Sequence, residues 1–328
     1  MCMTTGRPFD DIRALTEDMP QADIQALKSV TKILENFGPH LSPLGRMGSY
    51  LEWLASWQGK APSIDRPLIA VFAATHGVAK SVYGEDIVPT ALARVKSMTE
   101  GQTAVRGISS AMQAAFKVFE LGLEYPCADF TVEPSLPEKD SAAAIAFGME
   151  VVAEGADIIA LGNAGFGSAT AAAAIARGLY GGAAEYWAGG VGEDSQKRID
   201  LVSAGANFHK DKLSDPLEVL RCFGGRDLAG MVGAILAARH QAIPVILDGY
   251  VVCAAAAVLH KLNPDAISHC IAGHVSAEPA HQALLDRMEL KPMLNMDIGI
   301  GDGTGATLAL THLRAAAQGL QTLTATSS

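Results

Sequence analysis

Short apolar runs alternate with longer amphipathic or alanine-rich runs along most of this chain, and that alternation limits the folds it can adopt. The predicted strands are Leu68–Ala74, Tyr125–Val132, Asp157–Leu161, Ile243–Leu247 and Ala266–Ala272. The predicted helices that follow them are Thr90–Val118, Ser141–Ala153, Ser168–Arg177, Val251–Leu262 and Glu278–Met288. Such β-α units build a parallel sheet that is buried on both faces. We therefore predict an α/β fold with a Rossmann-like parallel sheet, helices on both of its faces, and ligands at the carboxyl ends of its strands.

Both ends of the chain are predicted to be helical. Two helices, Gln21–Phe37 and Arg46–Trp57, precede the first strand, and Ala306–Gln318 is the last helix. Because 328 residues exceed the usual size of one compact domain, a small helical domain built from both ends is the simplest arrangement. A three-helix cap on the same core is an equally compatible alternative. The predicted division is residues 1–62 and 301–328 for the small domain and residues 63–300 for the Rossmann-like domain.

Charge and cysteine spacing exclude several classes of function. The formal net charge is −10 without any basic cluster, which argues against binding of nucleic acid or of an anionic membrane. The five cysteines show no C-x-x-C spacing and the nine histidines no H-x-x-x-H spacing, so we expect no metal and no cofactor. No apolar run suits a signal peptide or a spanning helix. We predict a cytoplasmic protein.

A glycine-rich segment, Gly299–Ala306, places a single carboxylate, Asp302, where an extended stretch meets the last helix. Glycines such as Gly301 and Gly303 permit positive φ angles and close approach of a ligand, and a helix N-terminus attracts anions. Asp302 is therefore a candidate general base beside a bound anion. The alternative is that Asp302 only caps the helix.

Other polar residues follow predicted strands, where an α/β sheet binds ligands. The loop with Asn163, Gly165 and Gly167 suits a phosphate or a ribose, or is only a structural turn. Asp248 and Ser276 either face the ligand or cap the following helices. His76 either contacts substrate or orders its loop.

Several motifs in one collinear order resemble the nicotinate-nucleotide–dimethylbenzimidazole phosphoribosyltransferase family. The resemblance runs from about Leu41 to Leu310, and the family implies a homodimer with sites at the subunit interface. The motifs are Leu44-Gly45-Arg46, Thr75-His76-Gly77, Asp215-Pro216-Leu217-Glu218-Val219-Leu220, Gly224-Gly225, Leu247-Asp248-Gly249, Ser276-Ala277-Glu278-Pro279 and Gly301-Asp302-Gly303-Thr304-Gly305-Ala306.

The resemblance also implies a reaction, which is phosphoribosyl transfer from nicotinate mononucleotide to 5,6-dimethylbenzimidazole. The family's base is a Glu, and the matching residue here is Asp302, whose arm is shorter by one methylene, about 1.5 Å. A second family acid aligns with Asn163, which cannot take a proton at neutral pH. Tyr83 and Glu85 fall in the base-pocket stretch.

The same resemblance places the donor nucleotide against Gly165, Gly167, Ser276 and Gly301. Arg198 best matches the family's phosphate-contacting Lys, with Lys197 as the neighbouring alternative.

Two other functions stay open. A catalytically altered paralogue could bind a nucleotide or a benzimidazole or use a different acceptor. A dinucleotide-dependent oxidoreductase would rest only on the glycine loop Gly162–Gly167, which contains Asn163 and Gly165.

Overall fold

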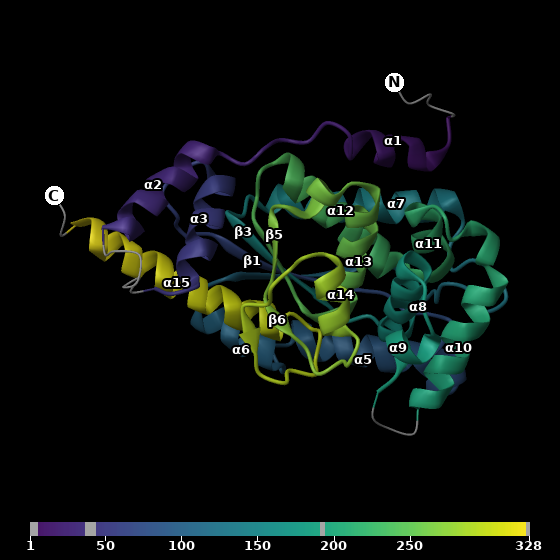
Figure 1. Cartoon of the computed structure of the whole chain (residues 1–328). Helices are drawn as coiled ribbons and strands as arrows, with labels where there is room; N and C mark the ends of the chain where they lie inside the picture. Colours follow the sequence, from purple (N-terminus) through teal and green to yellow (C-terminus); the bar gives the residue numbers. More distant parts are fainter. Residues whose placement is uncertain (1–5, 37–43, 191–193, 326–328) are drawn as a thin grey trace.

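The computed structural model describes residues 6–36, 44–190 and 194–325. Its centre is a five-stranded, wholly parallel sheet with the strand order β2-β1-β3-β4-β5 (Figure 1). The strands are β1 (Pro67–Ala73), β2 (Ala115–Glu120), β3 (Ile158–Asn163), β4 (Val245–Leu247) and β5 (Cys270–Ala272). A second sheet pairs β6 (His274–Val275) with β7 (Leu294–Asn295). The strand order reverses between β1 and β3, which confirms the predicted doubly wound fold and makes a crevice at that point.

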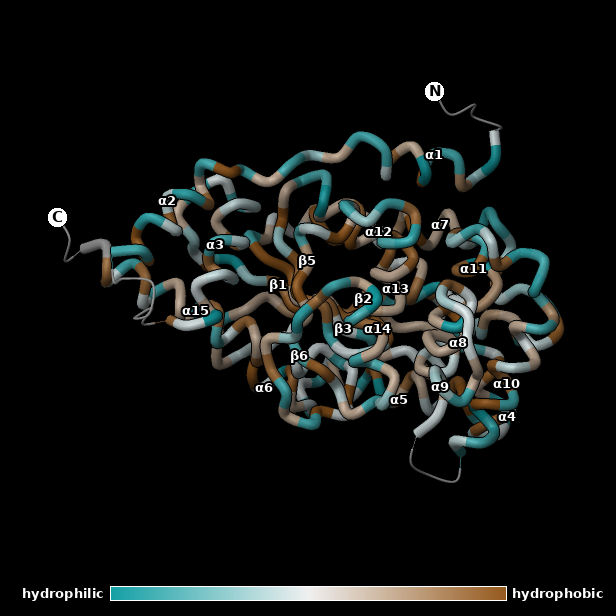
Figure 2. Tube along the Cα trace, viewed as in Figure 1, coloured by the Kyte–Doolittle hydropathy of each residue, from teal (hydrophilic) through white to brown (hydrophobic). Residues whose placement is uncertain are grey.

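Alternate side chains of the central strand enter two different cores. On β1, Leu68, Ala70 and Phe72 pack in one apolar cluster, whereas Ile69, Val71 and Ala73 pack in the other. Every β1 residue is buried, and the hydropathy colouring of Figure 2 shows β1 and β3 as apolar segments inside the molecule. The sheet is therefore covered on both faces, as a parallel sheet requires.

Helices supply the other half of each core. The first core contains residues of α7 (Glu138–Met149), α8 (Ser168–Tyr180), α11 (Pro216–Phe223), α12 (Arg226–His240) and α13 (Gly249–Leu262). The second contains residues of α2 (Ile24–Glu35), α3 (Met47–Gln58), α5 (Ile87–Thr99), α6 (Ala104–Ala111) and α15 (Thr304–Ala325). The remaining helical segments are α1 (Pro8–Leu15), α4 (Ala79–Tyr83), α9 (Ala184–Ala188), α10 (Ser195–Phe208), α14 (His281–Arg287), η1 (Glu150–Glu154), η2 (Lys210–Lys212) and η3 (Pro264–Ile267).

The helices of both chain ends meet at one side of the molecule. There α2 and α3 pack together with α15 (Figure 1), and their buried side chains belong to the second core of the sheet. In contrast, α1 lies apart from α2 and packs on α7. The division into a small domain and residues 63–300 stays a prediction.

One stretch of the predicted secondary structure is wrong. The segment Tyr125–Val132 is a loop, and the strand in its place is β2, whose first four residues were predicted as the end of the helix Thr90–Val118. Gly101 ends that helical stretch with φ of +82° and Gln113 turns the chain with φ of 54°. Because β2 is an edge strand in which three of the six residues are exposed and one is buried, its mixed polarity resembles that of an amphipathic helix. The predicted strand from Ala266 also begins late, since η3 occupies Pro264–Ile267.

Two glycines allow α7 and α12 to pack backbone against backbone. A Cβ atom on Gly148 would lie 1.8 Å from the carbonyl oxygen of Gly230, and one on Gly233 would lie 1.9 Å from that of Ile145. We expect Gly148→Ala to lower the free energy of unfolding by about 3 kcal/mol, because the obstacle is backbone that cannot rotate away. Urea unfolding would measure the loss. Gly107→Ala is the control, since Gly107 is an exposed helical residue with open space around it. This variant should raise the free energy of unfolding by about 0.5–1 kcal/mol, because Ala favours a helix more than Gly does.

Candidate active site

A cavity of about 240 Å³ lies at the carboxyl ends of the strands. The cavity takes lining residues from the loop after β3, from the first turns of α8 and α13, and from the glycine-rich loop before α15. The lining residues are Tyr83, Arg94, Asn163, Gly165, Phe166, Gly167, Ser168, Ala169, Thr170, Gly249, Tyr250, Val251, Ser276, Glu278, Gly299, Ile300 and Gly301. The predicted crevice therefore collects six predicted site residues: Tyr83, Asn163, Gly165, Gly167, Ser276 and Gly301.

Two helix N-termini face this cavity. The first turn of α8 contributes Ser168 and Thr170, and the first turn of α13 contributes Tyr250 and Val251. First-turn amides of a helix lack intrahelical acceptors and carry partial positive charge. Gly167, with φ of +92°, starts α8 in a conformation that other residues rarely adopt. The arrangement suits an anionic ligand such as a phosphate.

An aromatic pair forms another part of the cavity wall. The rings of Tyr83 and Phe166 lie 5.0 Å apart at an interplanar angle of 55°. Aromatic faces of this kind suit a planar heterocycle. Glu85, which was predicted beside Tyr83, lies outside the cavity lining, and its side chain, 82% exposed, pairs with Lys80 at 2.9 Å.

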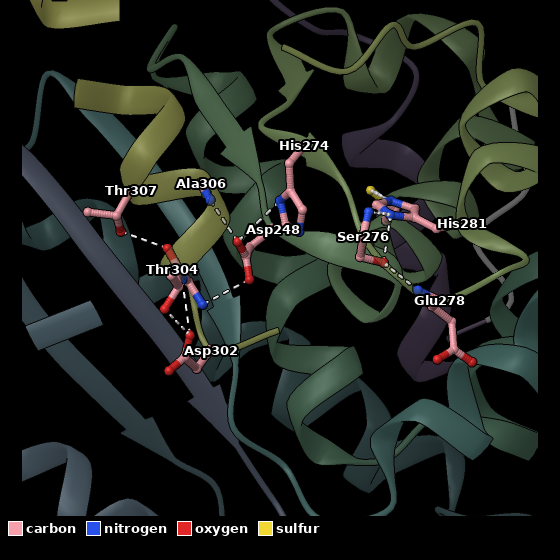
Figure 3. Close-up of polar contacts among 11 residues, drawn as sticks. Asp248, His274, Ser276, Glu278, His281, Asp302, Thr304, Ala306 and Thr307 are labelled. Atoms are coloured by element: carbon pink, nitrogen blue, oxygen red, sulfur yellow. Dashed lines mark hydrogen bonds and ion pairs between the residues drawn. The ribbon is translucent and has the colours of Figure 1, made fainter. Parts of the chain in front are cut away.

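Asp302 is buried behind the lining, and only 1% of the residue is exposed. Its Oδ1 accepts hydrogen bonds from the amide of Thr304 at 3.1 Å and from the Thr304 hydroxyl at 2.6 Å. Figure 3 shows the carboxylate turned toward Thr304 and away from Ser276 and Glu278. The capping alternative is therefore confirmed for one oxygen, while the expected direct exposure to the cavity is not observed. Gly301, the preceding residue, lines the cavity.

Asp248 holds the glycine-rich loop in place instead of lining the cavity. Its Oδ2 accepts from the amide of Gly303 at 2.9 Å, and its Oδ1 accepts from the amide of Ala306 at 2.7 Å (Figure 3). Burial raises the pKa of Asp248 to about 7, although both amides counteract the rise, and nearby Asp302 adds to it. Asp248 was predicted to face the ligand or to cap its own helix, but its carboxylate caps α15, and Gly303 likewise lies behind the lining.

His76 belongs to a buried polar cluster beneath the cavity floor. Its Nε2 lies 2.9 Å from Oδ1 of Asp227 and 3.3 Å from Oγ of Ser168. Asp227 Oδ2 accepts from Ser168 Oγ at 2.6 Å and from Asn163 Nδ2 at 2.7 Å. The cluster therefore fixes two residues that line the cavity, Asn163 and Ser168, and His76 supports the site without lining it.

The buried His76–Asp227 pair is ionised. Burial alone would lower the pKa of His76, but Asp227 and the thiol of Cys127 outweigh it and raise that pKa to about 10. Burial would raise the pKa of Asp227, but His76, Ser168 and Asn163 lower it to about 2. Asp227 was missed by sequence reasoning, because an Asp in the first turn of α12 looks like an ordinary helix-start residue and its partner lies 151 positions away.

Ser276 is positioned by a histidine. The amide of Ser276 donates to Nδ1 of His281 at 2.8 Å, and Oγ of Ser276 lies 3.0 Å from the same nitrogen. Burial lowers the pKa of His281 to about 3, with a further contribution from His274. The imidazole is therefore neutral and accepts hydrogen bonds from Ser276.

The two candidate phosphate cations differ in their surroundings. Arg198 Nη2 lies 2.6 Å from Oε1 of Glu278, which lines the cavity, and the Arg198 side chain is 15% exposed. Lys197 is 56% exposed and lies 3.4 Å from Asp194. Arg198 itself does not line the cavity, and residues 191–193 lie outside the described part of the chain.

Two other properties bear on function. Among the residues that the structure describes, no group of three or more His, Cys, Asp or Glu residues has the geometry of a metal site. No helix in the described ranges combines the length and the apolar character needed to cross a membrane.

Comparisons with known proteins give one consistent result. A phosphoribosyltransferase family model matches residues 19–328. The nicotinate-nucleotide–dimethylbenzimidazole phosphoribosyltransferase of Allorhizobium ampelinum is 46% identical over 319 residues, covering 95% of this chain and 93% of that protein. The protein of the same name from Brucella anthropi is 46% identical over 320 residues, with 95% and 94% covered.

Solved structures of Thermus thermophilus proteins are also similar. A nicotinate-nucleotide–dimethylbenzimidazole phosphoribosyltransferase structure matches with a TM-score of 0.82 at 28% identity, covering 91% of this chain and 96% of that one. A structure described as CobT matches with a TM-score of 0.81 at 29% identity, with 90% and 96% covered.

Proposed function

Since this chain belongs to the nicotinate-nucleotide–dimethylbenzimidazole phosphoribosyltransferase family, we propose that it transfers the phosphoribosyl group of nicotinate mononucleotide to 5,6-dimethylbenzimidazole or a related azole. The products are α-ribazole 5′-phosphate, used for the cobalamin lower ligand, and nicotinate. The relatives described above give no support to an altered paralogue or to a dinucleotide oxidoreductase. The membership confirms the resemblance seen in the sequence motifs.

One observation carries the proposal, which is that helix N-termini and an aromatic pair line the same cavity. The N-termini of α8 and α13 suit the phosphate of the donor. Tyr83 and Phe166 suit a planar heterocycle. A phosphate and a heterocycle are the two ends of a nucleotide, and Ser276 and Gly165 also line this cavity.

The chemistry needs a proton acceptor but no strong electrophile. The pyridinium of the donor carries positive charge, so its glycosidic bond breaks with the electron pair leaving on the ring nitrogen as neutral pyridine. One azole nitrogen forms the new bond to the sugar carbon, and the other azole nitrogen loses its proton to a general base. We assign that base to Asp302, through Oδ2, because Oδ1 is engaged by Thr304.

This assignment requires a local movement. Asp302 is 1% exposed and lies behind the segment Gly299–Gly301, which forms part of the cavity wall. A base must come within hydrogen-bond distance of its proton, although free enzymes often show longer distances. A Cβ on Gly301 would have nothing within 4 Å. Such a movement must break the 2.7 Å hydrogen bond from the amide of Asn163 to the carbonyl of Gly301, while Asp248 keeps the amides of Gly303 and Ala306 in place.

The proposed reaction is tested by incubating purified protein with nicotinate mononucleotide and dimethylbenzimidazole. The expected result is nicotinate and α-ribazole phosphate in equal amounts, detected by liquid chromatography and mass spectrometry. A competent relative is assayed in parallel. Absence of both products, while the relative is active, would reject the proposed function.

Arg198 is proposed as the cation that binds the donor phosphate. Replacing it by Ala is expected to raise the KM for nicotinate mononucleotide by roughly 10- to 100-fold, the range for loss of a charge-assisted hydrogen bond. Lys197→Ala is the matched control and should change KM by less than about threefold, because Lys197 is more exposed and contacts Asp194. The opposite order of effects would assign the phosphate to Lys197.

Cellular location and assembly are also proposed. The four described cysteines are free and buried, which suits the reducing cytoplasm. The family resemblance supports a homodimer with sites at the subunit interface. Light scattering coupled to size-exclusion chromatography would measure the mass, and a value of one chain would contradict the dimer.

A further inference from the structure

Glu278 is the only carboxylate among the described residues that line the cavity. Its Oε1 lies 2.6 Å from Nη2 of Arg198, and within the described ranges its Oε2 has no hydrogen-bond partner. The amide of Glu278 donates to Oγ of Ser276 at 3.4 Å, and Figure 3 shows these two residues side by side and apart from Asp302. One oxygen of this carboxylate is therefore held in place, while the other is available to a ligand.

The charge of a carboxylate limits which part of the nucleotide can lie beside it. An ionised carboxylate only accepts hydrogen bonds, and it repels other anions at short distance. Both the phosphate and the nicotinate carboxylate are anions. The pyridinium has no N–H or O–H group, and a carboxylate that bound its positive charge would stabilise the ground state, because the transfer removes that charge. The groups of nicotinate mononucleotide that suit Glu278 are therefore the two ribose hydroxyls.

The position of Glu278 also suits the sugar. Its partner Arg198 is the proposed phosphate-binding cation, and in a nucleotide a single methylene carbon joins the phosphate oxygen to the ribose ring. The two hydroxyls form a cis-diol, so they can donate to both oxygens of one carboxylate. Oε1 can accept from a hydroxyl as well as from Arg198, because each carboxylate oxygen has two lone pairs. Carboxylates bind ribose hydroxyls in dinucleotide-binding α/β proteins in the same way.

We propose that Glu278 determines which sugar the protein accepts, by receiving hydrogen bonds from the 2′- and 3′-hydroxyls of the ribose. The proposal rests on the proposed function, in which the substrate is a ribonucleotide. Arg198 holds the carboxylate in the orientation for these hydrogen bonds. A contact of this kind is the same before and during the transfer, so its loss raises KM and leaves kcat nearly unchanged. The bonds formed and broken in the transfer stay the same.

The test compares nicotinate mononucleotide with its 2′,3′-dideoxy analogue, which lacks only the two hydroxyls. Calorimetry with the full-length protein gives the Kd of each nucleotide without an acceptor base, so no turnover is needed. The wild type is expected to bind the ribonucleotide more tightly by roughly 10- to 100-fold, the range for hydrogen bonds to a charged group. Glu278→Met keeps a long side chain without an acceptor oxygen and is expected to reduce this preference to below about threefold.

Two further variants separate this contact from indirect effects. Glu278→Gln keeps one acceptor oxygen and should keep only part of the preference. Asp286→Asn changes an exposed carboxylate on α14 and should keep all of it. Loss of the partner of Arg198 affects both nucleotides alike through their common phosphate, so this effect cancels in the ratio of the two Kd values.

The outcomes distinguish the ribose contact from the reaction. Equal Kd values for the two nucleotides in the wild type, failure of nicotinate mononucleotide to bind, or an unchanged preference in either Glu278 variant would overturn the proposal. A preference in Kd that depends on Glu278, without any turnover, would reject the proposed reaction but keep the ribose contact.

Discussion

Replacing Asp302 by Asn is expected to lower kcat for phosphoribosyl transfer by roughly 10²- to 10⁴-fold, the usual contribution of a general base. An amide oxygen can still accept from Thr304, as Oδ1 of Asp302 does, and Asn caps helices about as well as Asp. The amide cannot take a proton. We therefore expect the free energy of unfolding and the Kd for nicotinate mononucleotide to change little. Single-turnover rates at saturating donor and azole would measure the chemical step.

Two variants distinguish a base from a cap. Asp302→Glu lengthens the arm by one methylene and should retain more activity than Asn. Glu278→Gln changes the carboxylate that lines the cavity but is paired with Arg198, and its effect should fall mainly on donor binding. If Asp302→Asn keeps most of the rate while Glu278→Gln loses it, the base is Glu278 and Asp302 is only a cap.

The arrangement of the fold could be predicted because its signals are local. A buried strand between two helices appears in the sequence as a short apolar run. The observed β1, β3 and β4 lie within the predicted ranges or differ from them by one or two residues at an end. The edge strand β2 gave no such signal, because alternate side chains face solvent. The loop after β3 was placed correctly at the crevice, since parallel strands end at the same edge, whereas His76, in the loop after β1, does not line the cavity.

Of the site, the sequence predicted only residues that belong to its motifs. Gly165 and Ser276 line the cavity because each follows a strand directly. Contacts across the chain could not be read from the motifs, since nothing near Asp248 shows that its carboxylate caps a helix that begins at Thr304. Arg94, which also lines the cavity, was missed for a related reason, because one arginine on an amphipathic helix ordinarily faces solvent.

Asn163 stands where the family resemblance predicts an acid, and its hydrogen bonds show what the amide does there. The family resemblance predicts a carboxylate at this position, and the side chain here is an amide. Asn163 Nδ2 donates to Oδ2 of Asp227 at 2.7 Å, and its Oδ1 accepts from the amide of Gly165 at 3.1 Å. A negative charge thus stands directly behind the position, although it is balanced by His76. Asn163 therefore positions the loop after β3 and has no free proton-accepting group.

Replacing Asp227 by Ala is expected to lower the free energy of unfolding by about 3–5 kcal/mol, the usual cost of removing one partner of a buried ion pair. His76, Ser168 and Asn163 would each lose a hydrogen-bond acceptor at a fully buried position. Urea unfolding at pH 6 would measure the loss. Asp211→Ala is the control, because Asp211 is exposed, and should change stability by less than about 0.5 kcal/mol.

The pH dependence of the free energy of unfolding tests whether the charges of Asp227 and His76 cause this loss of stability. The raised pKa of His76 gives stability that is complete below its ordinary value of 6.5 and is lost as pH rises toward about 10. The lowered pKa of Asp227 gives stability that is present above 3.8 and is lost as pH falls toward about 2. The difference between wild type and Asp227→Asn should therefore be largest between pH 4 and 6.5 and should shrink from pH 6.5 to 9. A difference that stays constant over that range would show that packing and neutral hydrogen bonds, not the ion pair, account for the role of Asp227.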